Sequence, residues 1–228
     1  MRQLRENINE NYGESIVHMK NGTFDFTRNK FWNNESFSDL KISSVLSNDI
    51  MKLVNNFFGK LYGYSTTSQE LFRESRGGFS TLVHVSAASG EPQVNMLHNT
   101  FVFAEYGVQM AGTIVVDISR NIFMSHSETA IDVLDPVNVD VTVDENLFWA
   151  NTMNGETGTN SWEADPLLVD PLNGDFHLQP GSAAIDKVSG GSITSDIDGQ
   201  LRPMGFGIDL GTDEFEDDIY LFLPLILH

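Results

Sequence analysis

The chain lacks cysteine, has few basic residues and contains no long hydrophobic run. Without cysteine, disulfide-stapled secreted domains and thiolate-bound zinc or iron–sulfur sites are excluded. Only 13 Lys and Arg stand against 32 Asp and Glu, and the resulting net charge of −19 disfavours nucleic-acid partners because phosphate backbones would be repelled. The apolar stretch at 219–227 is far shorter than the roughly 20 residues of a membrane-spanning helix, so we expect no membrane span.

The acidic residues are concentrated in the second half of the chain. Residues 1–114 carry 10 basic and 11 acidic side chains, whereas residues 115–228 carry 3 and 21. A solvated acidic surface and a calcium-binding region are both compatible with this asymmetry. Hydrophobic residues make up 40% of the 228 residues, which is enough for a sizeable core and too much for a disordered chain.

One pattern recurs five times: apolar, any, apolar, any, any, Asn, any, Phe. The copies span 24–31, 51–58, 94–101, 116–123 and 141–148, and a degenerate sixth is centred on Asn7. Most intervals between the asparagines are 22 to 27 residues, with one of 43. A weaker alternating segment precedes each asparagine, at 17–19, 40–42, 83–85, 108–110 and 131–133. Each unit therefore contains two or three short strands and no helical periodicity.

This repeat predicts an all-β parallel β-helix solenoid of about six to seven coils. We expect each repeat asparagine to adopt the left-handed conformation of a tight turn and to bond to the equivalent amide one coil away. The phenylalanine two residues later would stack inside the coil. A leucine-rich repeat has a similar pattern but requires a further Leu three residues before the first apolar position, where this chain has Asn21, Asn48, Glu91, Thr113 and Asn138.

The sequence divides into three regions. Coils occupy 1–150, with an inserted side loop at 59–80; the last coil and a loop-rich C-terminal cap region occupy 151–216; an acidic and then apolar tail follows at 217–228. A β-helix exposes strand edges at both ends, and the Pro- and Gly-rich C-terminal region suits the covering of one end. Coil-like sequence begins near residue 1, so we expect a longer native chain with more coils and a signal peptide before it.

Four segments of the C-terminal half form a distinctive string: DPLLVDP at 165–171, NGDFHLQPGSAAID at 173–186, DIDGQLRP at 196–203 and GIDLGTDEF at 207–215. This string resembles the C-terminal region of bacterial choice-of-anchor Q domain surface proteins, within the right-handed, pectate-lyase-like parallel β-helix superfamily. The resemblance covers 165–216 closely and the coils by pattern. It implies a right-handed β-helix in an extracellular or cell-surface protein. Because this superfamily contains lyases, hydrolases, epimerases and adhesins, it implies no single reaction.

The middle residues of the alternating segments should form an outward column on one sheet: His18, Lys41, His84, Gln109 and Asp132. A polysaccharide lyase would need a base and cations on such a face, and the catalytic candidates are Lys41, His84 and Asp132. Candidates for glycan binding are His18 and Gln109, together with Tyr62, Tyr64 and Arg76 of the side loop. A solvated polar face is the competing interpretation.

A second candidate site is the C-terminal carboxylate cluster, whose possible calcium ligands are Asp196, Asp198, Asp209 and Asp213. Asp196-x-Asp198-Gly199 resembles the opening of a calcium loop, but no Glu stands at the required offset. A buried ion-pair network around Arg202 explains the same residues without a metal, and we favour it. The sequence thus predicts a surface module serving as a stalk, adhesive or carbohydrate-binding segment, with a polysaccharide lyase as the alternative.

Overall fold

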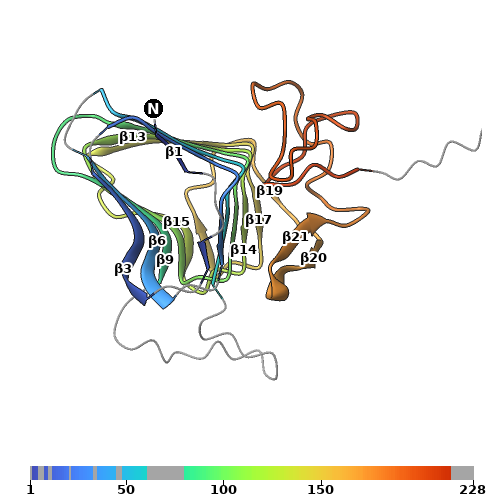
Figure 1. Cartoon of the computed structure of the whole chain (residues 1–228), viewed down its shortest axis with the longest axis horizontal. Helices are drawn as coiled ribbons and strands as arrows, with labels where there is room; N and C mark the ends of the chain where they lie inside the picture. Colours follow the sequence, from blue (N-terminus) through green and yellow to red (C-terminus); the bar gives the residue numbers. More distant parts are fainter. Residues whose placement is uncertain are drawn as a thin grey trace, which may run out of the picture.

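The computed structural model describes residues 2–4, 8–9, 12–20, 22–32, 35–44, 48–60 and 80–216. In this part of the chain, strands from successive turns stack side by side into three parallel sheets of six, seven and six strands. Figure 1 shows the three sheets as the walls of a solenoid seen nearly end-on. The expected all-β parallel β-helix is confirmed.

The chain visits the three sheets in the order A, B and then C on each turn, except that it enters the last strand of sheet B directly from sheet C. Sheet A contains β1 (Arg2–Leu4), β4 (Phe24–Thr27), β7 (Ile50–Val54), β10 (Gln93–Leu97), β13 (Ile114–Ser119) and β16 (Val139–Asp144). Sheet B contains β2 (Ile8–Asn9), β5 (Lys30–Trp32), β8 (Phe57–Gly59), β11 (Thr100–Val102), β14 (Ile122–Met124), β17 (Leu147–Trp149) and β19 (Trp162–Glu163). Sheet C contains β3 (Tyr12–Lys20), β6 (Glu35–Ser44), β9 (Thr81–Ala87), β12 (Tyr106–Gly112), β15 (Thr129–Val133) and β18 (Met153–Gly155).

A ladder of fully buried asparagines joins the turns at the corner between sheets A and B. Each side-chain Nδ2 donates to the Oδ1 of the next asparagine at 2.9–3.1 Å, and the backbone N–H of each donates to the same oxygen. The expected ladder is confirmed, and its members are Asn29, Asn56, Asn99, Asn121 and Asn146. Asn146 is the last asparagine of the ladder, and its backbone N–H donates to the Ser161 hydroxyl at 3.1 Å instead of to another asparagine.

The prediction that these asparagines adopt the left-handed conformation is wrong. Positive φ angles of 52–62° occur instead at the residue before each one: Arg28, Asn55, His98, Arg120 and Glu145. The ladder amide must lie inside the corner to reach its neighbours, so the preceding residue makes the turn. The hydrogen bonds of the ladder thereby override the local preference of asparagine for that conformation.

The phenylalanines stack in a second internal column, as predicted. Neighbouring rings have centroids 4.8–5.4 Å apart and planes within 5–14° of parallel. This spacing matches the distance of about 4.8 Å between strands, so one ring per turn fills the interior. The column consists of Phe31, Phe58, Phe101, Phe123 and Phe148, all at most 1% exposed.

Residues 165–216 pack along the outer face of sheet B. This region contains an antiparallel pair, β20 (Leu168–Asp170) and β21 (Asp175–Leu178), joined by the short helix η1 (Pro171–Asn173). Its buried apolar residues, among them Phe176 and Leu210, form one core with Phe57, Ile122 and Leu147 of sheet B. We expected these residues to cover an end of the solenoid, whereas Figure 1 shows them against its side. The reason is that sheet B also presents apolar side chains outward.

No helix in the described ranges is long and apolar enough to span a membrane.

Candidate functional site

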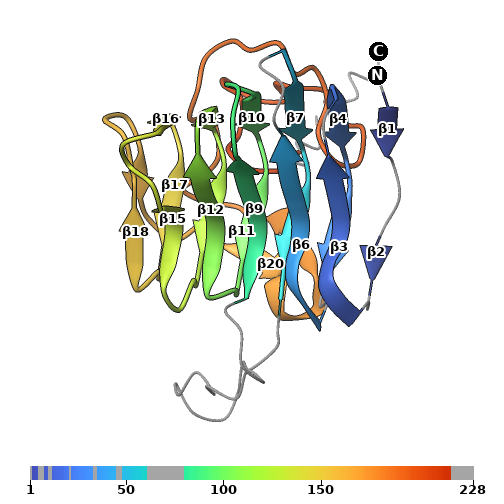
Figure 2. The ribbon, with the colours of Figure 1, turned by 90° about the vertical axis from the view of Figure 1, so that its left-hand side faces the viewer.

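The strand register aligns the predicted polar column on sheet C. His18 pairs with Lys41, which pairs with His84, and the alignment continues through Gln109 to Asp132. His18 is exposed and the other four are half-buried, and each residue lies between core-facing neighbours in its strand. In Figure 2, which shows sheet C from outside, no described segment crosses this face. The structure therefore presents five polar residues in a row across five strands.

Two parts of the column differ in character. In the middle of the column, burial and the neighbouring Lys41 ammonium lower the pKa of His84, which keeps its imidazole neutral near pH 7. Toward the Asp132 end, Gln109 accepts a hydrogen bond from the Thr81 hydroxyl and donates one to Asp132 Oδ2 at 3.0 Å. The column thus offers cationic, neutral and acidic hydrogen-bonding groups in sequence.

One aromatic residue, Tyr106, lies on the same strand as Gln109 and close enough to Asp132 to feel its charge. It pairs with Thr81 and Thr129 in the neighbouring strands. Burial and the carboxylates of Glu128 and Asp132 raise the pKa of its hydroxyl, which therefore stays protonated. The predicted loop ligands Tyr62, Tyr64 and Arg76 lie outside the described residues, as does most of the predicted side loop at 59–80.

The four predicted calcium ligands fall into two pairs: Asp196 and Asp209 bond backbone N–H groups, whereas Asp198 and Asp213 lie beside His177. Asp196 Oδ1 accepts the backbone N–H groups of residues 198, 199 and 200 at 2.8–3.0 Å. Asp209 accepts the N–H groups of Asp186 and Phe215, both at 2.7 Å. Both carboxylates are almost completely buried and organise loops. Asp198 and Asp213, in contrast, approach each other beside His177.

The buried ion pair around Arg202, which we favoured from the sequence over a calcium site, is present. Arg202 Nη1 donates to Glu214 Oε2 at 3.0 Å, and both side chains are inaccessible to solvent. The guanidinium also donates to the backbone carbonyls of Asp209 and Gly211. It reaches across to the solenoid as well, where His98 Nδ1 lies 3.5 Å from Nη1. This network fixes the C-terminal region against sheet B.

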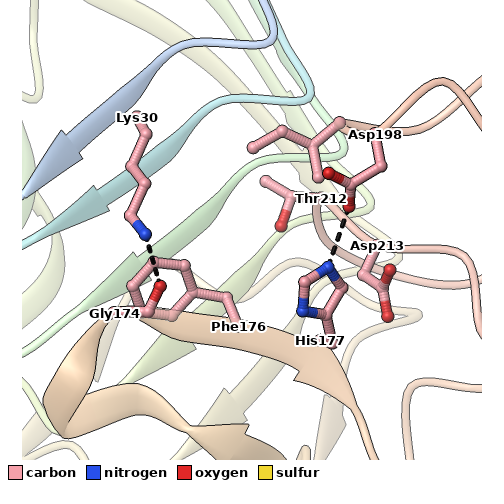
Figure 3. Close-up of a pocket in the computed structure, with 8 residues that line it drawn as sticks. Lys30, Gly174, Phe176, His177, Asp198, Thr212 and Asp213 are labelled. Carbon is pink, nitrogen blue, oxygen red and sulfur yellow. Dashed lines mark hydrogen bonds and ion pairs between the residues drawn. The ribbon is translucent and has the colours of Figure 1, made fainter. Parts of the chain in front are cut away.

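A pocket of about 90 Å³ opens between β21 and the loops around residues 197 and 212. Its wall includes Phe176, His177, Asp198 and Asp213, with Lys30 of sheet B at one side (Figure 3). His177 Nε2 lies 2.8 Å from Asp198 Oδ2, and His177 Nδ1 lies 2.5 Å from Asp175 Oδ1. Partial burial lowers the pKa of His177, but the hydrogen bonds to Asp198 and Asp175 outweigh it and raise this pKa to about 9.

Within the described ranges, His177, Asp198 and Asp213 form the one group of three or more His, Asp or Glu residues close enough to share a metal ion. Sequence reasoning missed His177. The available signal was the Asp175-x-His177 spacing, which places both side chains on one face if the segment is a strand, as β21 is. Asp198 lies 21 residues further on, in a loop whose position the sequence does not reveal.

No family model matches the chain, and no curated protein or solved structure was found to be similar to it.

Proposed function

We propose that this chain is a carbohydrate-binding or adhesive module of an extracellular or cell-surface protein, and that the outer face of sheet C is its binding surface. The resemblance of residues 165–216 to bacterial choice-of-anchor Q domain proteins supports the cell-surface setting. The observation that carries the binding role is the aligned column from His18 to Asp132 on a sheet face that no described segment covers.

The geometry suits an extended ligand. Equivalent side chains repeat about every 4.8 Å along the solenoid, so a linear glycan could contact several turns at once. Hydroxyl groups of a sugar both donate and accept hydrogen bonds, and this column offers both kinds of partner. The net charge of −19 disfavours polyanions, so we expect a neutral polysaccharide rather than an acidic one.

The test is a glycan array followed by titration of the best ligand. We expect His84→Ala and Asp132→Ala each to weaken binding at least tenfold. The matched control is Lys52→Ala, an exposed residue on sheet A, which should bind like the parent. Failure to bind any glycan, or equal affinity in all four proteins, would overturn the proposal.

A polysaccharide lyase is the second candidate, and the neutral His84 beside Lys41 favours it. A neutral imidazole can accept the proton next to a uronate carboxylate, and an adjacent ammonium can stabilise the charge that develops. Incubation with pectate, alginate and chondroitin, with and without calcium, tests this reaction. Unsaturated products that absorb in the ultraviolet and disappear in Lys41→Ala would establish the lyase and replace the binding role.

A further inference from the structure

We propose that His177, Asp198 and Asp213 form a binding site for a divalent first-row transition metal such as Zn²⁺. One ligand atom from each of the three residues lies within 4.8 Å of the others. Figure 3 shows the imidazole and the two carboxylates converging at one side of the pocket, from β21 and two separate loops. This site is distinct from sheet C and does not depend on the proposed glycan binding.

The imidazole is oriented as metal-bound histidines are. Such histidines usually bond a carboxylate through the ring nitrogen that does not bind the metal, and this second bond fixes the ring. Here Asp175 bonds His177 Nδ1 and leaves Nε2 directed toward Asp198. Asp175 belongs to the same strand as His177, so β21 supplies both the ligand and the group that orients it.

Asp213 provides a reason to expect a cation. It is only 4% exposed, and its Oδ2 accepts the backbone N–H of Leu178 at 2.7 Å. A buried carboxylate is costly unless a cation or several hydrogen bonds compensate its charge. Asp175 and Asp198 add two further negative charges near the same imidazole. The His177 imidazolium and the Lys30 ammonium in the same pocket leave one of these three negative charges uncompensated. A divalent ion in place of the imidazole proton would neutralise the group.

The ligand set favours a transition metal over calcium. Calcium takes six to eight oxygen ligands, whereas imidazole suits zinc, copper, iron and nickel. Around zinc, with bonds of about 2.0 to 2.2 Å, ligand atoms lie about 3.3 Å apart. The distance of 2.8 Å between His177 Nε2 and Asp198 Oδ2 is shorter than this and is typical of a hydrogen bond, in which the two atoms share a proton. Binding would therefore require a modest separation of the two atoms, and the metal would take the place of that proton, which is released to solvent.

The experiment uses the full chain without a histidine tag, stripped with chelator and titrated calorimetrically with Zn²⁺, Mn²⁺ and Ca²⁺. We expect one Zn²⁺ per chain, weaker Mn²⁺ binding and no calcium binding that depends on His177. Repeating the Zn²⁺ titration at pH 7 in two buffers of different ionisation enthalpy should show the release of about one proton. Bound Zn²⁺ should also raise the melting temperature, since it joins β21 to both loops.

Three variants identify the ligands. Asp198→Asn changes a half-exposed side chain, so the fold should survive, and it should weaken Zn²⁺ binding at least tenfold. His177→Ala should abolish binding. Asp170→Asn is the control, because this residue lies on the adjacent strand β20 and bonds Asn173 instead. Absence of stoichiometric Zn²⁺ binding, or unchanged binding in folded Asp198→Asn, would overturn the proposal and leave the three residues as an ion-pair cluster.

Discussion

At the residue scale, each ladder asparagine satisfies several buried polar groups at once. Asn99 donates to Asn121 Oδ1 and to the Leu53 carbonyl, and its own Oδ1 accepts two N–H groups from Asn56. Leaving buried donors or acceptors without partners costs about 1–3 kcal/mol for each group. The Asn99 side chain thus links three consecutive turns by hydrogen bonds.

Asn99→Ala should therefore lower the free energy of unfolding by about 3 kcal/mol. Urea denaturation followed by circular dichroism measures the change. Asn138→Ala is the control, since Asn138 is exposed and bonds Asp135 in a surface turn, and its effect should stay within about 0.5 kcal/mol. Equal effects of the two substitutions would contradict a stabilising role for the ladder.

At the element scale, sheet B differs from the other two sheets because both of its faces are buried. The middle residue of most of its strands belongs to the internal phenylalanine column, whereas Phe57, Val102 and Leu147 face the C-terminal region. Phe176 of β21 stacks on Phe57 and contacts Trp32, so it links the antiparallel pair to two strands of sheet B.

Phe176→Ala should cost about 3–5 kcal/mol, because it removes a buried aromatic side chain and leaves a cavity between two elements. The same substitution should change the fluorescence of Trp32, whose ring lies 5.4 Å from that of Phe176. Val169→Ala on β20 serves as the control, since Val169 is 46% exposed. A loss below about 1 kcal/mol would mean that the C-terminal region is held mainly by its polar contacts.

The periodic elements could be predicted from sequence, and the packing between them could not. The Asn-x-Phe spacing predicts the ladder and the ring column, because each depends on a residue type repeated once per turn. The side-on packing of 165–216 was missed although Ile122-Phe123-Met124 and Leu147-Phe148-Trp149 are continuous apolar runs, which are typical of strands buried on both faces. His177 was missed because its metal-site partners come from loops distant in sequence.

At the scale of the whole molecule, stability should depend on pH through buried histidines. His126 is 1% exposed, and burial lowers its pKa to about 4. Since the folded pKa is below the unfolded value of 6.5, the folded state prefers the neutral ring. The stabilisation is complete above pH 6.5 and is lost as the pH falls toward 4, by about 3 kcal/mol. Burial, followed by the charges of Arg202 and Arg120, lowers the pKa of His98 in the same direction.

Comparison with His126→Gln isolates this contribution. Urea denaturation at several pH values between 4 and 7 should show that the parent loses about 3 kcal/mol more than the variant over this range. The comparison is needed because burial raises the pKa of Asp209 to about 7, which favours the folded state at lower pH and opposes the histidine effect. Parallel curves for parent and variant would show that His126 does not titrate in this way.

The interval between Asn56 and Asn99 is the longest in the repeat, yet the ladder bond between them, at 3.1 Å, is like the others. The strands on either side of this interval keep their register: β8 still pairs with β11, and β6 still pairs with β9. Additional chain at the corner between sheets B and C therefore leaves the stacking unchanged. A protein engineer could therefore graft a recognition peptide between β8 and β9 without disturbing the register of the flanking strands.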